Sequence, residues 1–557
     1  MNADRLLAHY DRIADAPDAV ARLRRFILDL AVRGRLVPQD PKDEVASDLL
    51  KRIAKEKARL MKVGEIRKPK PLPEVDEPPF DVPPSWCWTR IREITSDRGQ
   101  TVPEVEFTYI DVTSIDKENG IVADPKVLPA SEAPSRARKI TRKGDVIYSC
   151  VRPYLLNVAV IEIDFDPAPI ASTAFAILNG HGLVLPRYLW IVLRSPFMVE
   201  RVEEAQRGQA YPAINDADFA VLPFPLAPLA EQHRIVAKVD ELMALCDRLE
   251  AARAAREATR DRLTAASLAR LNTPNPDTFQ GDARFARHVL PALTARPDQI
   301  RQFRQTILNL AVRGKLVPQD PKDESIRLPP HRQFATASGM DDEVFEQSCT
   351  LMVLPKGWRI APLALLSEHI VDCPHTTPKW TTQGEICIRT NQLRPGRLDL
   401  SEPRYVSPDT YLERIERLEP RTDDILYSRE GGILGVACRV PKGTRLCLGQ
   451  RLMLIRAGTE TNAVFLELVL NSPFITGIAK ARTTGGAAPR VNMSTVRAYP
   501  IPLPPVAEQR RILAKVDALM ALCDRLKTSL TTDDDTRRRL LEALLRDALE
   551  SALEQAA

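Results

Sequence analysis

Apolar residues recur in two stretches of the chain at the spacing of a helix that packs along one side. Within each stretch they alternate steps of four and three residues, which is the a/d spacing of a coiled coil. The pattern predicts a long helix over 229–263 and another from 505 onward, each beginning after prolines. An ordinary helix of a bundle is the plainer alternative. The two stretches contain Ile235, Val239, Leu242, Cys246 and Leu249, then Ile512, Val516, Leu519, Cys523 and Leu526.

The rest of the chain changes between helix-like and strand-like patterns. An apolar face at helical spacing predicts a helical block over 18–62. Short β-branched and aromatic runs, separated by turn residues, predict a strand-rich domain from 86 to 227, with one helix at 186–203. The second variable stretch, 355–504, has the same order of elements. The expected strands of the first domain lie at 107–115, 144–151, 158–165 and 172–178.

Two blocks of the sequence occur twice. Residues 24–44 return at 304–324 with four of 21 positions changed, and residues 231–249 return at 508–526 with three of 19 changed. The stretches between these blocks differ in most positions. An internal repeat constrains the architecture before any other signal. It predicts one scaffold that carries two modules of shared fold and different targets.

The predicted fold class is α+β. Two similar mixed α/β domains are separated by long, paired, antiparallel helices, and a pseudo-twofold repeat relates the halves. Clusters of proline support the boundaries, because proline stops helices. The expected parts are an N-terminal helical region at 1–68, a proline-rich linker at 69–85, a first variable domain at 86–227, a long helix at 228–270, a connecting segment at 271–354 that includes the repeated helix 297–324, a second variable domain at 355–504 and a C-terminal helix at 505–557.

Composition narrows the class of protein. The chain has 557 residues and a net charge of +5, from 79 basic and 74 acidic residues. That charge does not require nucleic acid but permits local basic surfaces. There is no apolar run of membrane-span length and no signal-peptide core at the N-terminus. The nine scattered cysteines form no CxxC pair, which argues against structural zinc and disulfides. We expect a cytoplasmic protein with no membrane partner.

No catalytic motif is visible in the sequence. A DNA amino-methyltransferase needs a glycine-rich cofactor loop and an Asn-Pro-Pro-aromatic motif. The nearest string, Glu77-Pro78-Pro79-Phe80, lies in a proline-rich linker and lacks the amide. The GxxxxGK[ST] loop of nucleotide-driven motors is absent, and no histidines pair at metal-ligand spacing. We therefore expect no catalytic residue and no metal or cofactor bound by this chain.

The repeated blocks resemble those of the specificity subunit of type I restriction-modification systems. The resemblance is carried by LAVRGRLVPQD and LAVRGKLVPQD, then by PLAEQHRIVAKVDELM and PPVAEQRRILAKVDALM. Within the second variable domain, DCPHTTPKW, EICIRTNQL and YSREGGILG are similar to parts of a target-recognition domain. The resemblance covers residues from about 18 to 550. It is specific because both repeated blocks occur twice and in the same order.

This resemblance implies a non-catalytic reader of double-stranded DNA. Each variable domain would contact half of an asymmetric bipartite site. The helices would space the domains and dock two adenine-methyltransferase subunits, to which restriction subunits are added. S-adenosylmethionine, ATP and Mg²⁺ would then be used by those partners. Residues 271–297 and 328–354 match nothing assignable in shorter relatives.

Loops that mix basic, amide, hydroxyl and aromatic side chains are the expected DNA contacts. Such side chains reach phosphates and base edges alike. Ordinary polar loops, with Trp380 packed inward, are the plainer alternative. The candidates are Arg98, Gln100, Tyr109, Thr113, Arg152, Tyr154, Arg207, Gln209 and Tyr211 in the first domain, and His375, Thr376, Thr377, Lys379, Trp380, Arg389, Asn391, Arg429, Arg482, Gly486 and Arg490 in the second.

The repeated helices carry two further expectations. We expect Ile235, Val239, Leu242 and Leu249 to pair with Ile512, Val516, Leu519 and Leu526 as a spacer seam. Polar residues outside that seam would form two equivalent docking surfaces, although charged helix faces are usually just solvated. The docking candidates are Glu231, Gln232, Arg234, Glu508, Gln509 and Arg511.

Two other classes of protein remain open. One is a stand-alone nuclease or methyltransferase with unrecognised motifs. The other is a helical scaffold of protein-binding modules without DNA contact. A neighbouring methyltransferase gene, or co-purification with such a partner, would separate them from the DNA reader.

Overall fold

The computed structural model describes residues 15–66, 77–208, 211–324, 326, 339–458, 461–484 and 489–554. The chain divides into two compact units. Unit 1 comprises Met1–Ala255 and Asp534–Ala557, and unit 2 comprises Arg256–Asp533. Two long helices, α9 (Leu229–Asn272) and α20 (Val506–Glu554), each contribute one part to each unit. The expected α+β class is confirmed, since long scaffold helices occur together with largely antiparallel sheets.

The scaffold of unit 1 is built from α3 (Ala19–Val32), α4 (Ala46–Lys62) and the first part of α9. The apolar face predicted for α3 is buried at Val20, Ile27 and Leu30. The first variable domain leaves this scaffold and returns to it through an antiparallel pair of strands, β1 (Cys87–Arg90) and β11 (Pro223–Leu226). Domain entry and exit are therefore held side by side.

The first variable domain contains two sheets. One has the order β10-β7-β8-β4-β3 and the other the order β5-β2-β9-β6. The strands are β2 (Phe107–Ile110), β3 (Ile115–Asp116), β4 (Ile121–Val122), β5 (Lys126–Leu128), β6 (Ala137–Ile140), β7 (Val146–Ser149), β8 (Val158–Val160), β9 (Pro169–Ser172) and β10 (Phe175–Leu178). Two short helices complete it, α5 (Ile91–Ile94) and α8 (Asp216–Ala220).

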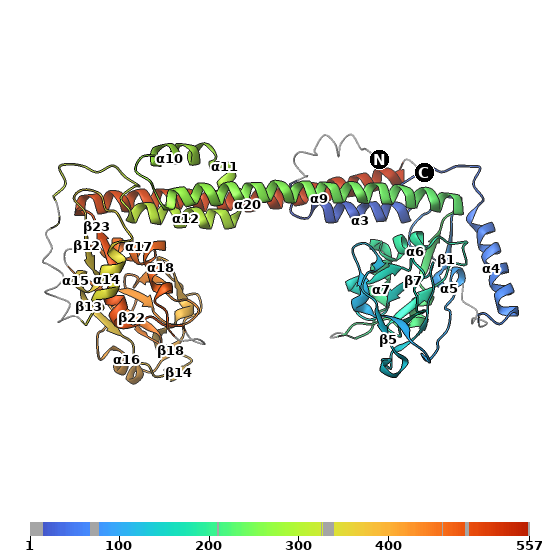
Figure 1. Ribbon diagram of the computed structural model, residues 1–557, viewed down its shortest axis with the longest axis horizontal. Helices are drawn as coiled ribbons and strands as arrows, with labels where there is room; N and C mark the ends of the chain where they lie inside the picture. The colour runs from blue at the N-terminus through green and yellow to red at the C-terminus, as the bar shows by residue number, and fades with distance from the viewer. Residues whose placement is uncertain are drawn as a thin grey trace. The chain divides into compact units, whose positions relative to one another are not determined.

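The single helix expected at 186–203 is wrong in one respect. The structure has two helices, α6 (Pro186–Leu193) and α7 (Pro196–Ala205). Ser195 caps the second helix by accepting a hydrogen bond from the Met198 amide, and Pro196 fits only the first turn of a helix. Both helices contact α3, so they join the sheets to the scaffold (Figure 1).

Unit 2 repeats this plan. Its scaffold helix is α12 (Pro297–Val312), and β12 (Arg359–Pro362) pairs with β23 (Pro500–Leu503) where the second variable domain enters and leaves. The sheets have the orders β13-β22-β19-β20 and β14-β18-β15-β21. Their strands are β13 (Ser367–Asp372), β14 (Trp380–Thr381), β15 (Glu385–Ile388), β18 (Tyr405–Val406), β19 (Ile425–Ser428), β20 (Ala437–Arg439), β21 (Leu446–Leu448) and β22 (Leu452–Ala457), with a hairpin of β16 (Leu393–Arg394) and β17 (Arg397–Leu398).

Helices complete the second domain. Like α6 and α7 in unit 1, α17 (Ala463–Leu470) and α18 (Pro473–Ala481) contact the scaffold helix, here α12 (Figure 1). The others are α15 (Leu363–Leu366), α16 (Pro408–Ile415) and α19 (Met493–Arg497). Among the described residues no single helix is long and apolar enough to cross a membrane, and only the bent pair α17 and α18, taken together, meets that test.

The apolar positions of the long helices pack differently from the expected seam. Ile235 and Val239 belong to the core of unit 1, together with residues of α3, α6 and the β1–β11 pair. Ile512 and Val516 belong to the equivalent core of unit 2. The partly buried residues Leu242, Leu249, Leu519 and Leu526 pack against the same two cores. The predicted pairing of the two sets is therefore wrong, because each set faces its own scaffold and domain.

The segments without assignment in the sequence extend unit 2. Helices α10 (Phe279–His288) and α11 (Leu290–Leu293) pack with Leu268 and Leu271 of α9 and with α12. Helix α14 (Asp342–Cys349) places Val344 and Phe345 in the core of unit 2. In unit 1 the corresponding place is taken by the two ends of the described chain, where Ala16 and Ala19 pack on Leu541 and Leu544 of α20.

Candidate nucleic-acid interface

Both variable domains build the same crossed pair of loops. The loop after β7 meets the loop before α8 through backbone bridges of Ala213 to Val151 and Arg207. The loop after β19 meets the loop before α19 through bridges of Arg490 to Glu430 and Thr484. Residues that recur in both halves of the chain (Ser149 with Ser428, Pro212 with Pro489) make these bridges equivalent. By these bridges Arg490 takes the place of Ala213.

In the first domain the crossed loops present aromatic and basic side chains. Arg152 and Leu156 have positive φ angles of 49° and 54°, so the chain turns sharply around Tyr154. Tyr154 is 50% exposed and Tyr211 is 71% exposed. The Arg152 guanidinium lies 5.0 Å from the centre of the Tyr211 ring, a contact that holds a cation and a π-face together. This surface offers stacking and positive charge at one place.

Arg207, also in this loop pair, forms an ion pair with Asp218. Arg207 is exposed and its Nη2 lies 3.0 Å from Asp218 Oδ2, an exposed ion pair that a phosphate could replace. Gln209 lies outside the described residues.

Arg429 was expected on the interface, but it is a buried structural residue of the second domain. It is 7% exposed. Its guanidinium donates to Asp372 at 2.5 Å and to the carbonyl of Val491 at 3.2 Å. The position therefore joins β13 to the crossed loops, and a DNA contact is wrong for this residue. Its counterpart in the first domain is the buried Cys150.

The backbone of loop 373–380 in the second domain is held by hydrogen bonds, while several of its side chains are exposed. Arg414 is buried and donates to the carbonyls of Leu448 and Thr376, at 3.0 and 2.5 Å. Gln450 donates to the His375 carbonyl at 2.8 Å and to Thr377 Oγ1 at 3.1 Å. The side chains of the loop that remain exposed are His375, Thr376, Thr377 and Lys379. His375 Nε2 lies 3.2 Å from Asp372 Oδ2. A held backbone with exposed polar side chains is suited to reading a ligand.

Trp380, at the end of this loop, is half-buried. It packs against a small core under β15 and β21, so the inward-packing alternative describes part of the ring. The guanidinium carbons of Arg389 and Arg404 lie 5.9 and 5.5 Å from its ring centre. Arg389 is half-buried and Asn391, which follows the same strand, is exposed. Arg404 was not among the expected residues, because only the pairing of β15 with β18 brings it here.

Two other candidates of the first domain, Tyr109 and Arg98, are buried or partly buried. Tyr109 is 7% exposed and packs beside Phe107, so a DNA contact is wrong for it. Arg98 is partly buried, and its Nε donates to Asp145 at 2.6 Å. Asp145 is fully buried and also accepts from Asn179 at 2.7 Å. Arg98 therefore has a structural partner, which Arg456 and Asp424 reproduce in the second domain at 2.8 Å.

The last candidates lie at the surface. Gln100 and Thr113 are exposed, although Thr113 already donates to Asp111 at 2.6 Å. Arg482 and Arg490 are exposed. Arg482 donates to Gln347 of α14. Gly486 lies outside the described residues.

The residues expected to dock partners form internal contacts instead. In unit 1 we call the contacts of Glu231, Gln232 and Arg234 the latch. Glu231 is 1% exposed and accepts from Trp86 Nε1 at 2.9 Å and from Gln39 Nε2 at 2.5 Å. Gln232, fully buried, accepts from the Leu185 amide at 3.0 Å and donates to the Ala227 carbonyl at 2.9 Å. These contacts tie α9 to the extended segment after α3 and to the entrance of the variable domain.

Unit 2 contains the same latch. Glu508 and Gln509 are each 1% exposed; Glu508 accepts from Trp358 Nε1 at 3.0 Å, and Gln509 donates to the Pro504 carbonyl at 3.0 Å. Docking is wrong for these two and for Glu231 and Gln232, because burial leaves them no surface. Burial raises the pKa of both Glu231 and Glu508, against the hydrogen bonds that lower it.

Arg234 and Arg511 complete each latch at its edge. Arg234 donates to Asp43 at 2.6 Å, and Arg511 donates to Asp323 at 2.6 Å. Each aspartate lies in the repeated segment VPQDPKDE. The hydrogen bond from the arginine lowers the pKa of Asp323. The close repetition of these helices is thus explained by internal contacts.

Among the residues that the structure describes, no group of His, Cys, Asp and Glu could hold a metal ion. The arrangement instead combines two similar loop surfaces, each with its own set of exposed polar and aromatic side chains. Such surfaces suit recognition by contact.

Known proteins share this organisation. A model of the type I restriction modification DNA specificity domain matches residues 402–532. The specificity subunit of the type I restriction enzyme EcoAI from Escherichia coli is 29% identical, over 94% of this chain and 93% of its own length. The EcoEI specificity subunit from the same species is 28% identical, over 95% and 94%.

A solved chain of a type I R-M system has the same fold, with a TM-score of 0.51 and 24% identity over 84% of this chain and 99% of its own. The relatives are named for specificity and not for catalysis, and they match almost from end to end. The repeated scaffold and the paired variable domains agree with them. The chain is therefore similar, almost from end to end, to the specificity subunits of type I restriction enzymes.

Proposed function

We propose that each variable domain reads one half of an asymmetric, bipartite site in double-stranded DNA. The observation that carries this proposal is the crossed loop pair, which has one backbone frame and two unlike sets of side chains. Bridges at Ala213 and Arg490 fix the same frame in both domains. A shared frame with different exposed chemistry supports two readers of different sequences.

The exposed side chains support different readouts. The first domain offers Tyr154, Tyr211 and Arg152, which suit stacking and phosphate or guanine contact. The second offers His375, Thr377 and Lys379, whose donors and acceptors suit base edges and phosphates. Two half-sites of different sequence follow from this difference.

The scaffold helices would hold the domains and dock two copies of an adenine methyltransferase, through which restriction subunits join. The buried latch cannot serve this purpose, but other repeated residues can. Leu245 is 42% exposed and its repeat mate Leu522 is 36% exposed. Arg248 and Arg525, three residues further on, are exposed as well. An exposed leucine repeated at the same helical position supports one kind of partner bound twice.

The chain itself would carry no catalytic step. S-adenosylmethionine, ATP and Mg²⁺ would be used by the partner subunits, and this chain would supply the address on DNA. We therefore expect the full chain, purified without partners, to transfer no methyl groups.

A domain exchange tests modular reading. Residues 86–227 are replaced by the equivalent domain of a relative with a known site, in the complete complex, and methylated sites are mapped. One half of the site should change and the other should stay. If both halves change, or neither does, the proposal fails. Exchange of 355–504 is the matched control and should change the opposite half.

A further inference from the structure

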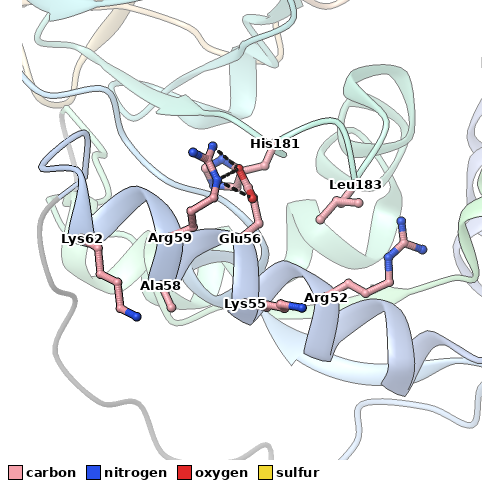
Figure 2. Close-up of a pocket in the computed structure, with 8 residues that line it drawn as sticks. All are labelled: Arg52, Lys55, Glu56, Ala58, Arg59, Lys62, His181 and Leu183. Carbon is pink, nitrogen blue, oxygen red and sulfur yellow. Dashed lines mark hydrogen bonds and ion pairs between the residues drawn. The ribbon is translucent and has the colours of Figure 1, made fainter.

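Helix α4 carries a line of cations along its exposed face. Arg52, Lys55, Arg59 and Lys62 are spaced by three, four and three residues, so they share one side of the helix. At about 1.5 Å per residue the line is about 15 Å long. It borders a cleft of about 690 Å³, whose other wall includes His181 and Leu183 (Figure 2).

The helix is fixed rigidly to the first variable domain. Lys57, on its opposite face, is 6% exposed and donates to the carbonyls of Arg92, Glu93 and Thr95, the last two at 3.2 and 2.8 Å. These carbonyls lie at the end of α5, where orphan acceptors attract a cation. Burial lowers the pKa of Lys57 to about 8. The buried lysine holds the exposed cations in place.

The cleft keeps an excess of positive charge. Among the described residues that line it, the one carboxylate, Glu56, accepts from Arg59 at 2.7 Å (Figure 2), and Arg52 pairs with Glu44 at 2.7 Å. No described residue forms an ion pair with Lys55 or Lys62. Both are therefore available to an anionic ligand.

The chemistry of this face favours a nucleic-acid backbone over a protein. The exposed residue beside the cations in the lining of the cleft is an alanine, Ala58. Protein interfaces have cores enriched in aromatic residues and methionine and depleted in lysine. Along about 15 Å, one strand of B-DNA carries about four phosphates at 3.4 Å each. A small residue beside regularly spaced cations lets such a strand approach closely.

We propose that this face of α4 binds the phosphate backbone of the DNA beside the half-site read by the first domain. The inference rests on the proposed function. It adds an anchor that is independent of sequence and that, among the described residues, occurs in unit 1 only. Among the described residues of unit 2 that follow Glu324, the first helix is α14, and its exposed residues Asp342, Glu343 and Glu346 are acidic. The footprint on DNA should therefore extend further beyond the first half-site.

The test removes two charges without touching a buried contact. The variant is Lys55→Gln with Lys62→Gln. The control is Lys42→Gln with Lys143→Gln, which removes equal charge from exposed positions of unit 1 outside the cleft. The full chain, co-purified with its methyltransferase subunit, is titrated against cognate and non-cognate duplexes at several salt concentrations. A second series shortens the cognate duplex from each end.

The slope of log affinity against log salt should become shallower by about 2 for the variant, at about 0.9 per lost phosphate contact. The ratio of cognate to non-cognate affinity should stay unchanged, because phosphates carry no sequence. Trimming beyond the first half-site should abolish the difference from wild type. A slope equal to that of the control overturns the inference, as does loss of the methyltransferase at unchanged slope, which would assign the face to an acidic protein. If the wild-type complex fails to prefer the cognate duplex, the proposed function fails instead.

Discussion

Glu231 is a buried carboxylate whose two hydrogen bonds join three parts of unit 1. Replacing it by alanine leaves Trp86 Nε1 and Gln39 Nε2 without their acceptor. Because unsatisfied buried donors cost about 1–3 kcal/mol, Glu231→Ala should lower the free energy of unfolding by about that amount. Urea unfolding of the full chain measures it. Glu241→Ala, at an exposed position of the same helix, is the control and should change stability by less than about 0.5 kcal/mol.

The same carboxylate gives the stability a pH dependence of defined sign. Burial raises the pKa of Glu231 above 4.5, its ordinary value. The folded state therefore holds its proton at a pH where the unfolded chain has lost it. This contribution to stability is present at low pH and is lost as the pH rises from 4.5 through the raised pKa. Glu231→Gln keeps an acceptor for Trp86 and should remove this dependence; a slope equal to that of wild type would contradict the assignment.

Single residues were the least predictable level of this protein. Arg429 and Tyr109 are types that contact DNA often, yet both are buried. Their environment depends on strands distant in sequence, as when Asp372 of β13 meets Arg429 after β19. Repetition of Glu231 and Glu508 was a reliable sign of importance. The repetition could not distinguish an internal latch from a docking surface, because residues of either kind would recur in both copies of the repeat.

At the level of elements, one glycine ends each scaffold helix in a left-handed turn. Gly34 has a φ of 66°, and an added Cβ would lie 2.5 Å from Pro83 Cγ. Gly314 repeats the turn against Pro355. Gly64, after α4, has a φ of 78° with nothing within 4 Å. Gly64→Ala should therefore cost only backbone strain, about 1–2 kcal/mol.

Gly34→Ala should cost more than this control by about 1–3 kcal/mol, because the new methyl group overpacks the contact with the linker. Unfolding free energies of the two variants are compared under the same conditions. Equal losses would show that the proline can move away, and that the turn tolerates the extra volume.

The helices were predictable as elements because their periodicity is local. The apolar series at Ile235 and Ile512 identified α9 and α20, and the repeat gave both variable domains a common fold. What the series could not give was the surface that those apolar residues face. An a/d pattern fits any single-sided packing, here the domain cores that contain Tyr188 and Tyr499. The break between α6 and α7 at Ser195-Pro196 was visible in the sequence, and the apolar stripe outweighed it.

For the whole molecule, the proposed docking of two methyltransferase copies makes the surfaces at Leu245 and Leu522 two independent partner sites. Leu245→Asp should remove one methyltransferase copy and Leu522→Asp the other, because a charge at a docking leucine opposes burial. Native mass spectrometry of the complex should show one copy lost in each single variant and two in the double variant. Leu351→Asp, at a 60% exposed leucine outside the long helices, is the control. Full occupancy in both single variants would place docking elsewhere.

Each long helix has its far part in the other unit. This has a consequence for a shortened product of the gene. Unit 1 needs Leu541 and Leu544 from the far part of α20, while unit 2 needs Leu268 and Leu271 from the far part of α9. A half-length product ending near residue 273 would carry one reader and a helix end with nothing of its own to cover. Two such products could each lend that end to the other. On the proposed function their complex would read the same half-site twice, so one truncation would convert an asymmetric DNA site into a symmetric one.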